Sequence, residues 1–173
     1  MNKTLFFLFC VFSIFSQKDD FLKGFSFKIN KNDSILTNII RGDCFGECPV
    51  YIASISTNGV VRFKGFKFTN FIGDTTFTIP KKQLQVITNA FIAVDYFKLN
   101  ESYISKTEFV KHSSGKVDTI YTVQSDGASS KTSFNFNNKF HSVYNYFGSP
   151  KKLDRLEDLI EIESKIKVLI YKN

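Results

Sequence analysis

The sequence has no tryptophan and only three prolines, and it contains no block of five or more like charges. Disordered chains combine low hydrophobicity with high net charge. This chain does not, because 43% of its residues are hydrophobic and 21 of them are phenylalanine. Its 173 residues allow one domain of ordinary size. The composition therefore excludes disorder and predicts an aromatic-rich core.

The motifs that identify common enzyme and cofactor-binding families are also missing. The sequence contains no G-x-S-x-G elbow, no Walker loop, no G-x-G-x-x-G and no H-E-x-x-H. His112 and His141 are far apart and follow no metal-binding pattern, so we expect surface or structural histidines. We predict no catalytic residue, no metal site and no cofactor.

Basic side chains outnumber acidic ones, giving a net charge of +7, but they are scattered. Proteins that bind nucleic acid gather such charge into a stripe or a known motif. Here the lysines alternate with phenylalanine, isoleucine and aspartate along strand-like runs, as on a solvated face. We expect no nucleic-acid partner, and an unknown protein or cell-envelope partner instead.

The N-terminus has the pattern of a secretory signal peptide. A positively charged start precedes an apolar run over residues 5–12, and small or polar residues follow. We predict a signal peptide over residues 1–17, cleaved near residues 16–17, and a single α+β domain of unknown function over residues 18–173. No later stretch approaches the roughly 20 apolar residues of a membrane helix. The mature protein is expected to be secreted or periplasmic, without a transmembrane segment.

Removal of this segment takes away Cys10 and leaves Cys44 and Cys48, a pair first interpreted as a disulfide in an oxidising compartment. Four extended residues span about 13 Å, but bridged Cα atoms lie roughly 4.4–6.8 Å apart. The chain must therefore turn, with Gly46 as the expected pivot. The alternative is a redox-active thiol pair. Such pairs are usually C-x-x-C at a helix start, whereas here Pro49 leads into a strand.

Alternation of apolar and polar residues predicts strands in the first half of the chain. The expected strands cover residues 25–29, 35–40, 50–56, 60–68 and 74–79. Pro80 suits a first helical turn, and apolar residues then recur with helical spacing, so a helix is expected over 80–95. Tyr96–Leu99 is expected to be extended.

Asn58-Gly59 between two alternating runs predicts a hairpin with a type I′ turn. Apolar residues stand at odd positions before Gly65 and at even positions after it. A bulge at Gly65 restores a single buried face, so we expect the strand register to break there. The phenylalanines expected in the core are Phe63, Phe66, Phe68 and Phe71. Left exposed, they would form a patch for a partner.

The second half predicts strands over residues 107–111, 117–124 and 132–136, and a short helix over 139–147. Ser149 is expected to cap a further helix that starts at Pro150. The apolar stripe of that helix is Leu153, Leu156, Leu159 and Ile160. Its acidic residues are Glu157, Asp158, Glu161 and Glu163, and we expect these to pair with neighbouring lysines and arginines on a solvated face. Residues 165–171 fit a helix or a strand.

Strands in runs with helices after them favour an α+β fold: an antiparallel sheet of hairpins with two main helices packed on one face. Because the order of hairpin, strand and helix occurs twice, two similar strand-strand-strand-helix halves are one way to build it.

The segment C-F-G-E-C-P-V-Y, followed by N-G-V-V-R-F-K-G, resembles a family of uncharacterised secreted bacterial domains, a domain of unknown function with a C-F-G-x-C-P-x-Y signature. The positions that carry the resemblance are Arg41, Cys44, Phe45, Gly46, Cys48, Pro49, Tyr51, Asn58, Gly59, Phe63 and Gly65. It extends over about residues 36–165 and implies no activity.

The favoured function is therefore an exported, non-catalytic binding or structural accessory module with a Cys44–Cys48 disulfide. Two alternatives stay open. One is a periplasmic thiol-redox or small hydrolytic enzyme. The other is an inhibitor-like module that binds a protein through the phenylalanine-rich hairpin.

Overall fold

A computed structural model describes residues 34–172, and the predicted signal peptide and the predicted strand over residues 25–29 lie outside that range. The strands are β1 (Ile35–Arg41), β2 (Val50–Ser56), β3 (Val60–Lys67), β4 (Gly73–Thr78), β5 (Ser102–Ile104), β6 (Lys106–Lys111), β7 (Val117–Thr122), β8 (Ser130–Phe136) and β9 (Lys139–Phe147). The helices are α2 (Lys81–Ala93), α3 (Lys151–Glu163) and α4 (Lys167–Ile170), with a 3-10 helix, η1 (Tyr96–Lys98).

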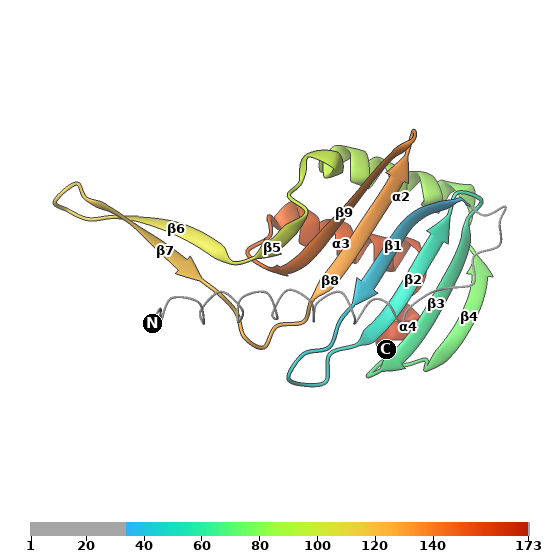
Figure 1. The fold of residues 1–173 in the computed structure, drawn as a ribbon. Coiled ribbons are helices and arrows are strands. Elements are labelled where there is room, and N and C mark those ends of the chain that lie inside the picture. Colours follow the sequence, from blue (N-terminus) through green and yellow to red (C-terminus); the bar gives the residue numbers. More distant parts are fainter. Residues whose placement is uncertain (1–33, 173) are drawn as a thin grey trace, which may run out of the picture. The chain divides into compact units, whose positions relative to one another are not determined.

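Seven strands form one sheet in the order β4-β3-β2-β1-β8-β9-β5, with α2 and α3 along one of its faces (Figure 1). All neighbours in this sheet pair antiparallel except β5 and β9, which run parallel. The predicted α+β fold, an antiparallel-dominated sheet of hairpins with two main helices, is confirmed. None of the helices described here has the length and apolar composition to cross a membrane.

The core between the sheet and α2 is aromatic. Phe91 of α2 stacks on Phe134 of β8, with ring centroids 4.1 Å apart. Tyr96 meets Phe91 edge-on, and its hydroxyl lies 2.7 Å from Thr132 Oγ1. Phe91 and Ile87 are both buried, as the helical spacing predicts. Phe91, Phe134 and Tyr96 thus fill part of the space between the two layers.

The Asn58-Gly59 hairpin forms between β2 and β3, but its turn is not type I′. Only Gly59 has a positive φ, of +85°, and its N–H donates to the Ser56 carbonyl at 2.9 Å. This is a three-residue connection closed by a left-handed glycine. Positive φ at two central positions occurs instead at Asn137 and Asn138, between β8 and β9. The short helix predicted over residues 139–147 is wrong, because this turn pairs the segment with β8 as a strand.

The register breaks at Gly65 as predicted. Tyr51 pairs with Gly65 and Val50 with Lys67, which leaves Phe66 as the extra residue. The bulge does not bury the phenylalanines that follow, however. Phe63 is in the core and Phe66 is half-buried, but Phe68 and Phe71 are 50% and 37% exposed. The prediction that all four belong to the core is therefore wrong.

Two smaller expectations also differ from the structure. Tyr96–Lys98 is a 3-10 turn and not extended, because Asp95 takes a left-handed conformation before it. Ser149 does not cap α3. Pro150 holds that position, and the Ser149 hydroxyl donates to Asp154 instead. Beyond α3 the chain turns into the short helix α4.

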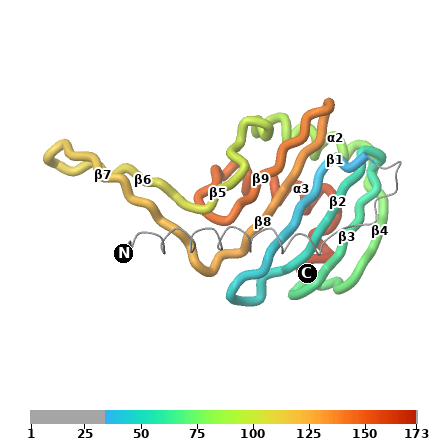
Figure 2. Tube along the Cα trace, in the orientation of Figure 1, coloured from blue at the N-terminus to red at the C-terminus, as the bar shows by residue number. Residues whose placement is uncertain are grey.

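The two halves of the chain are not equivalent. The first half forms four adjacent strands of the sheet, β1 to β4. In the second half, β6 and β7 pair only with each other and project from the sheet as a separate ribbon, which Figure 2 traces in yellow. We call residues 106–122 the arm.

Candidate functional site

One row of residues in register across the sheet presents polar side chains to α3. Tyr51 of β2 pairs with Arg41 of β1, Arg41 with Ser130 of β8, and Ser130 with Asn145 of β9. Residues paired in this way point to the same face of a sheet. On the other side of Tyr51 the row continues to Gly65, which has no side chain. Four polar groups are thus aligned beneath one helix.

Glu157 and Glu161 of α3 bind these polar groups through ion pairs and hydrogen bonds. Arg41 Nη1 lies 3.0 Å from Glu157 Oε2, and Arg41 Nη2 lies 3.0 Å from Glu161 Oε1. The Tyr51 hydroxyl donates to Glu161 at 2.6 Å, and the Ser130 hydroxyl donates to Glu157 at 2.6 Å. Both carboxylates are almost fully buried. We call these five residues the Arg41 cluster.

The environment of the cluster shifts the pKa of three of its members, Glu157, Tyr51 and Arg41. Burial raises the pKa of Glu157, against the opposing pull of Arg41 and Ser130. Burial also raises the pKa of Tyr51 well above its ordinary value, so its hydroxyl keeps its proton and can donate it to Glu161. For Arg41, burial opposes the charge, but attraction to its neighbours outweighs burial and raises the pKa. The guanidinium is therefore permanently charged.

The cluster joins α3 to the sheet through ion pairs and hydrogen bonds. A buried ion pair is weak evidence of net stabilisation, but removing one partner leaves an uncompensated charge and costs about 3–5 kcal/mol. Arg41 reaches both carboxylates, which are one helical turn apart on α3. Sliding α3 along the sheet by one turn would break this match. We infer that the cluster fixes the register of α3 on β1, β2 and β8.

The prediction that the acidic residues of α3 lie on a solvated face is wrong for Glu157 and Glu161. A signal for their burial is nevertheless present in the sequence. Glu157 follows Leu153 by four residues, and Glu161 follows Glu157 by four, so both extend the apolar stripe of the helix. Acidic residues in that position need a cation beside them, and Arg41 supplies it.

A surface pocket of about 360 Å³ opens beside the cluster, with Arg41, Glu157 and Asp154 in its wall. Asp154 already accepts hydrogen bonds from Asn145 at 3.1 Å and from Ser149 at 2.8 Å. Within residues 34–172, no three His, Cys, Asp or Glu side chains are placed to hold a metal ion. Ser130 also lines the pocket, and its hydroxyl is already engaged as a donor to Glu157.

The loop between β1 and β2 follows Arg41 directly and is closed by a disulfide. Cys44 and Cys48 are bridged with their Cα atoms 5.8 Å apart. The chain bends at residues 45–47 as expected, but a glycine is not required at position 46, because its φ is not positive and a Cβ there would meet only Cys44 Sγ, at 3.8 Å. The loop lies between two strands and not at a helix N-terminus, where a thiol pKa is usually lowered.

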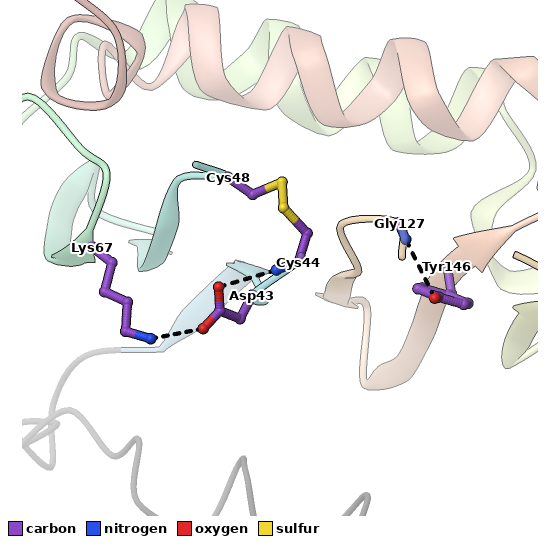
Figure 3. The surroundings of a disulfide bond; sticks show 6 residues. All are labelled: Asp43, Cys44, Cys48, Lys67, Gly127 and Tyr146. Carbon is purple, nitrogen blue, oxygen red and sulfur yellow. Dashed lines mark hydrogen bonds and ion pairs between the residues drawn. A yellow bond between two sulfur atoms is a disulfide. The ribbon is translucent and has the colours of Figure 1, made fainter. Parts of the chain in front are cut away.

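A second tie holds this loop to the neighbouring hairpin. Asp43 Oδ2 lies 2.7 Å from Lys67 Nζ at the end of β3, and Asp43 Oδ1 accepts from the Cys44 N–H (Figure 3). The hydrogen bond from Lys67 is the largest influence that lowers the pKa of Asp43. On the other side of the loop, Figure 3 shows Gly127 N–H donating to the Tyr146 hydroxyl at 3.3 Å.

Large apolar side chains are exposed at this end of the sheet. They come from the disulfide loop, the β3–β4 loop and α4. We call this set the aromatic end: Phe45, Phe68, Phe71, Ile72, Val168 and Tyr171. Phe45 is the most exposed, at 92%. The β3–β4 loop is tied to α4 because the Asn70 and Phe71 N–H groups donate to the Ile170 and Leu169 carbonyls, at 3.1 and 2.9 Å.

The path of the β3–β4 loop explains why residue 65 is a glycine. The same loop holds Phe68 in a strained backbone conformation. A Cβ on Gly65 would overlap the Phe71 carbonyl oxygen, so only glycine allows the loop to fold back over β3. Phe68 has a φ of +53°, in the left-handed region that bulky side chains rarely occupy. Such strain is typical of binding sites, where the surrounding structure holds an unfavourable conformation in place.

Comparison with known proteins gives a family and no activity. Residues 37–163, which are more than half of the chain, match the family described as Domain of unknown function (DUF6438). The chain belongs to this family. The part that matches DUF6438 contains the whole Arg41 cluster and the disulfide loop, and it ends before α4. No curated protein and no solved structure matches the chain. The predicted resemblance to an uncharacterised family is confirmed, whereas its signature and its secretion stay predictions.

The residues singled out in the sequence separate into two groups. Arg41 and Tyr51 meet in the cluster, and the disulfide loop carries Phe45, Gly46 and Pro49 at the same end of the sheet. The Asn58-Gly59 turn lies at the opposite end of β2. The residues that sequence reasoning missed are Glu157, Glu161, Ser130 and Asn145.

Proposed function

We propose that this chain is an exported, non-catalytic accessory module that binds a partner protein with its aromatic end. The observation that carries the proposal is Phe45, which is 92% exposed on a loop closed by a disulfide. Exposed apolar side chains gathered at one end of a sheet are typical of interaction sites. A side chain on a loop that is already ordered loses little conformational entropy when it binds.

The charges around the aromatic end favour a protein with an apolar groove and an acidic rim. Lys165, Lys167 and Lys172 are exposed on the segment that carries Val168 and Tyr171. Complementary charge on a partner would steer it to this end. An anionic membrane is the less suitable occupant, because Glu47 lies in the same short loop as Phe45 and would meet the headgroups.

Several features support a binding role over the enzymatic alternatives. Glu157 and Glu161 are buried, and both are paired with the partly buried Arg41, as is typical of residues that hold a fold together. A thiol-redox role would require a reactive thiolate, yet Cys44 and Cys48 lie between strands. The inhibitor-like alternative agrees with the proposal in using Phe68 and Phe71, which belong to the phenylalanine-rich hairpin.

The experiment is site-specific photocrosslinking in the producing cell. A photoreactive phenylalanine analogue replaces Phe45 in one strain and Ile92, which is exposed on α2, in another. We expect one prominent protein adduct from position 45 and none of the same mass from position 92. Ile72→Asp in the first strain should abolish that adduct, and Ile92→Asp should leave it.

Adducts of equal mass and yield from both positions would contradict the proposal, as would insensitivity to Ile72→Asp. Flotation of the purified protein with anionic vesicles, lost on Phe45→Asp, would assign the aromatic end to a membrane instead. Export is tested separately by the intact mass of the protein released from the cell. Cleavage near residues 16–17 supports it, and retention of residues 1–17 argues against it.

A further inference from the structure

The arm exposes apolar side chains on both of its faces. Every residue of β6 is exposed, and so is every residue of β7 except Asp118, which is half-buried. An isolated two-stranded ribbon is marginally stable in water and usually needs further strands or a packed face. Phe109 and Tyr121 are nevertheless 74% and 73% exposed. The arm therefore needs something to pack against.

The pairing register assigns these aromatic residues to one face. Phe109 is paired with Thr119, and Tyr121 with Thr107, so the two rings are diagonal neighbours on the same side of the ribbon. Lys111 and Val117 complete this face. We call these six residues the apolar face of the arm. The large rings alternate with small threonines, as in a checkerboard.

Apart from Lys111 at the edge of the apolar face, the charged side chains of β6 and β7 pair within the arm. Lys106 forms an ion pair with Glu108, and Asp118 lies 3.0 Å from Lys116 Nζ and 2.9 Å from His112 Nε2. Glu108 and Asp118 project from the side opposite the apolar face, because they alternate with its members along each strand. An acidic or basic partner would thus gain little from this surface.

We propose that the apolar face of the arm packs against the same face of a second copy of this chain, forming a symmetric dimer. A two-fold axis near the Phe109–Thr119 pair places each aromatic ring over a threonine of the other copy. Such an interface is self-complementary, as two-fold interfaces must be. Four aromatic side chains at about 150–250 Å² each, with the valines, bury on the order of 1,000 Å². That area suits a reversible dimer.

The sedimentation velocity of the protein, expressed from the full-length sequence, tests the proposal over a concentration series. We expect a shift from monomer to dimer as concentration rises, and no weakening when salt is added, because salt screens the repulsion between two basic chains. Phe109→Asp should weaken self-association by roughly a hundredfold or more. Ile120→Ser, on the opposite face, serves as the control and should change it by less than about threefold.

A rescue experiment guards against variants that merely unfold the arm. Phe109→Asp and Phe109→Lys should each be monomeric, and an equal mixture of the two should form a heterodimer, because the two positions meet near the two-fold axis. A wild-type protein that stays monomeric at the highest concentration overturns the proposal. So does self-association that Phe109→Asp leaves unchanged, or a mixture that remains monomeric.

Discussion

The Arg41 cluster and the arm place their side chains in opposite ways. In the cluster, two buried carboxylates and a partly buried guanidinium lie between α3 and the sheet and are bound to one another. In the arm, aromatic rings are exposed and the charged groups pair at the surface. Each arrangement departs from the ordinary rule that apolar side chains are buried and charges are exposed.

The difference separates two roles within one chain. Separating a buried ion pair is costly, and we infer that the cluster therefore specifies how α3 sits on the sheet. Exposed apolar side chains contribute little to the stability of a monomer and become useful when a partner covers them. Substitutions should therefore act on stability at the cluster and on association at the arm.

The largest expected effect on stability is that of Arg41→Met. It leaves Glu157 and Glu161 buried without their cation, and we expect the free energy of unfolding to fall by about 3–5 kcal/mol. Urea unfolding followed by circular dichroism measures this change. The control is Arg155→Met on the exposed side of α3, with an expected change within about 0.5 kcal/mol. Equal effects of the two variants would remove the distinction between buried and surface charge.

Tyr51→Phe is expected to have the next largest effect. It removes the hydroxyl that donates to Glu161 at 2.6 Å and leaves a buried carboxylate short of one hydrogen bond. We expect a loss of about 1.5–3 kcal/mol, again from urea unfolding. Tyr121→Phe on the arm makes the same chemical change at an exposed site and should alter stability by less than about 0.5 kcal/mol.

The contrast between these sites also explains what the sequence could predict. Alternation and helical spacing locate β1, β2, β3 and α2, because each has one buried face and local periodicity records it. The Arg41 cluster could not be predicted from local periodicity. Glu157 and Glu161 lie 116 and 120 positions from Arg41 along the chain. The tertiary fold, in which β1 lies beside β8, is needed to bring them together.

Two errors have the same origin. The helix predicted over residues 139–147 is β9, since pairing with β8 overrides an ambiguous local pattern. The sequence predicts Phe68 and Phe71 in the core, because phenylalanine is usually buried. They are exposed because the β3–β4 loop, tied to α4 at its backbone, carries them away from the sheet.

Opening the disulfide should cost less than breaking the cluster. With Cys44→Ser and Cys48→Ser together, we expect a loss of about 2 kcal/mol, because the closed loop is short. Thermal unfolding without reductant measures it. The intact mass of the wild-type protein after alkylation without reductant should show no modified thiol at these positions. Two alkylated thiols would contradict the Cys44–Cys48 disulfide and would favour the thiol-redox alternative.

The smallest expected effect is a dependence on pH. Because the pKa of Glu157 is raised in the folded protein, its contribution to stability is fully present below the ordinary value of 4.5 and is lost as pH rises through the folded value. Glu157→Gln lacks this dependence. The stability of the wild type relative to Glu157→Gln should therefore decrease as pH is raised from about 4 toward neutrality, in urea titrations at matched ionic strength. A difference that increases with pH would show that the pKa of Glu157 is lowered.

Hydrogen–deuterium exchange resolved by segment tests the contrast most directly. At low protein concentration, we expect the amides of β1, β2 and β8 to exchange only when the whole fold opens, and those of β6 and β7 to exchange at least about a thousandfold faster. Raising the concentration should then protect the arm alone. An arm as well protected as β1 and β2 in the dilute protein would contradict the account.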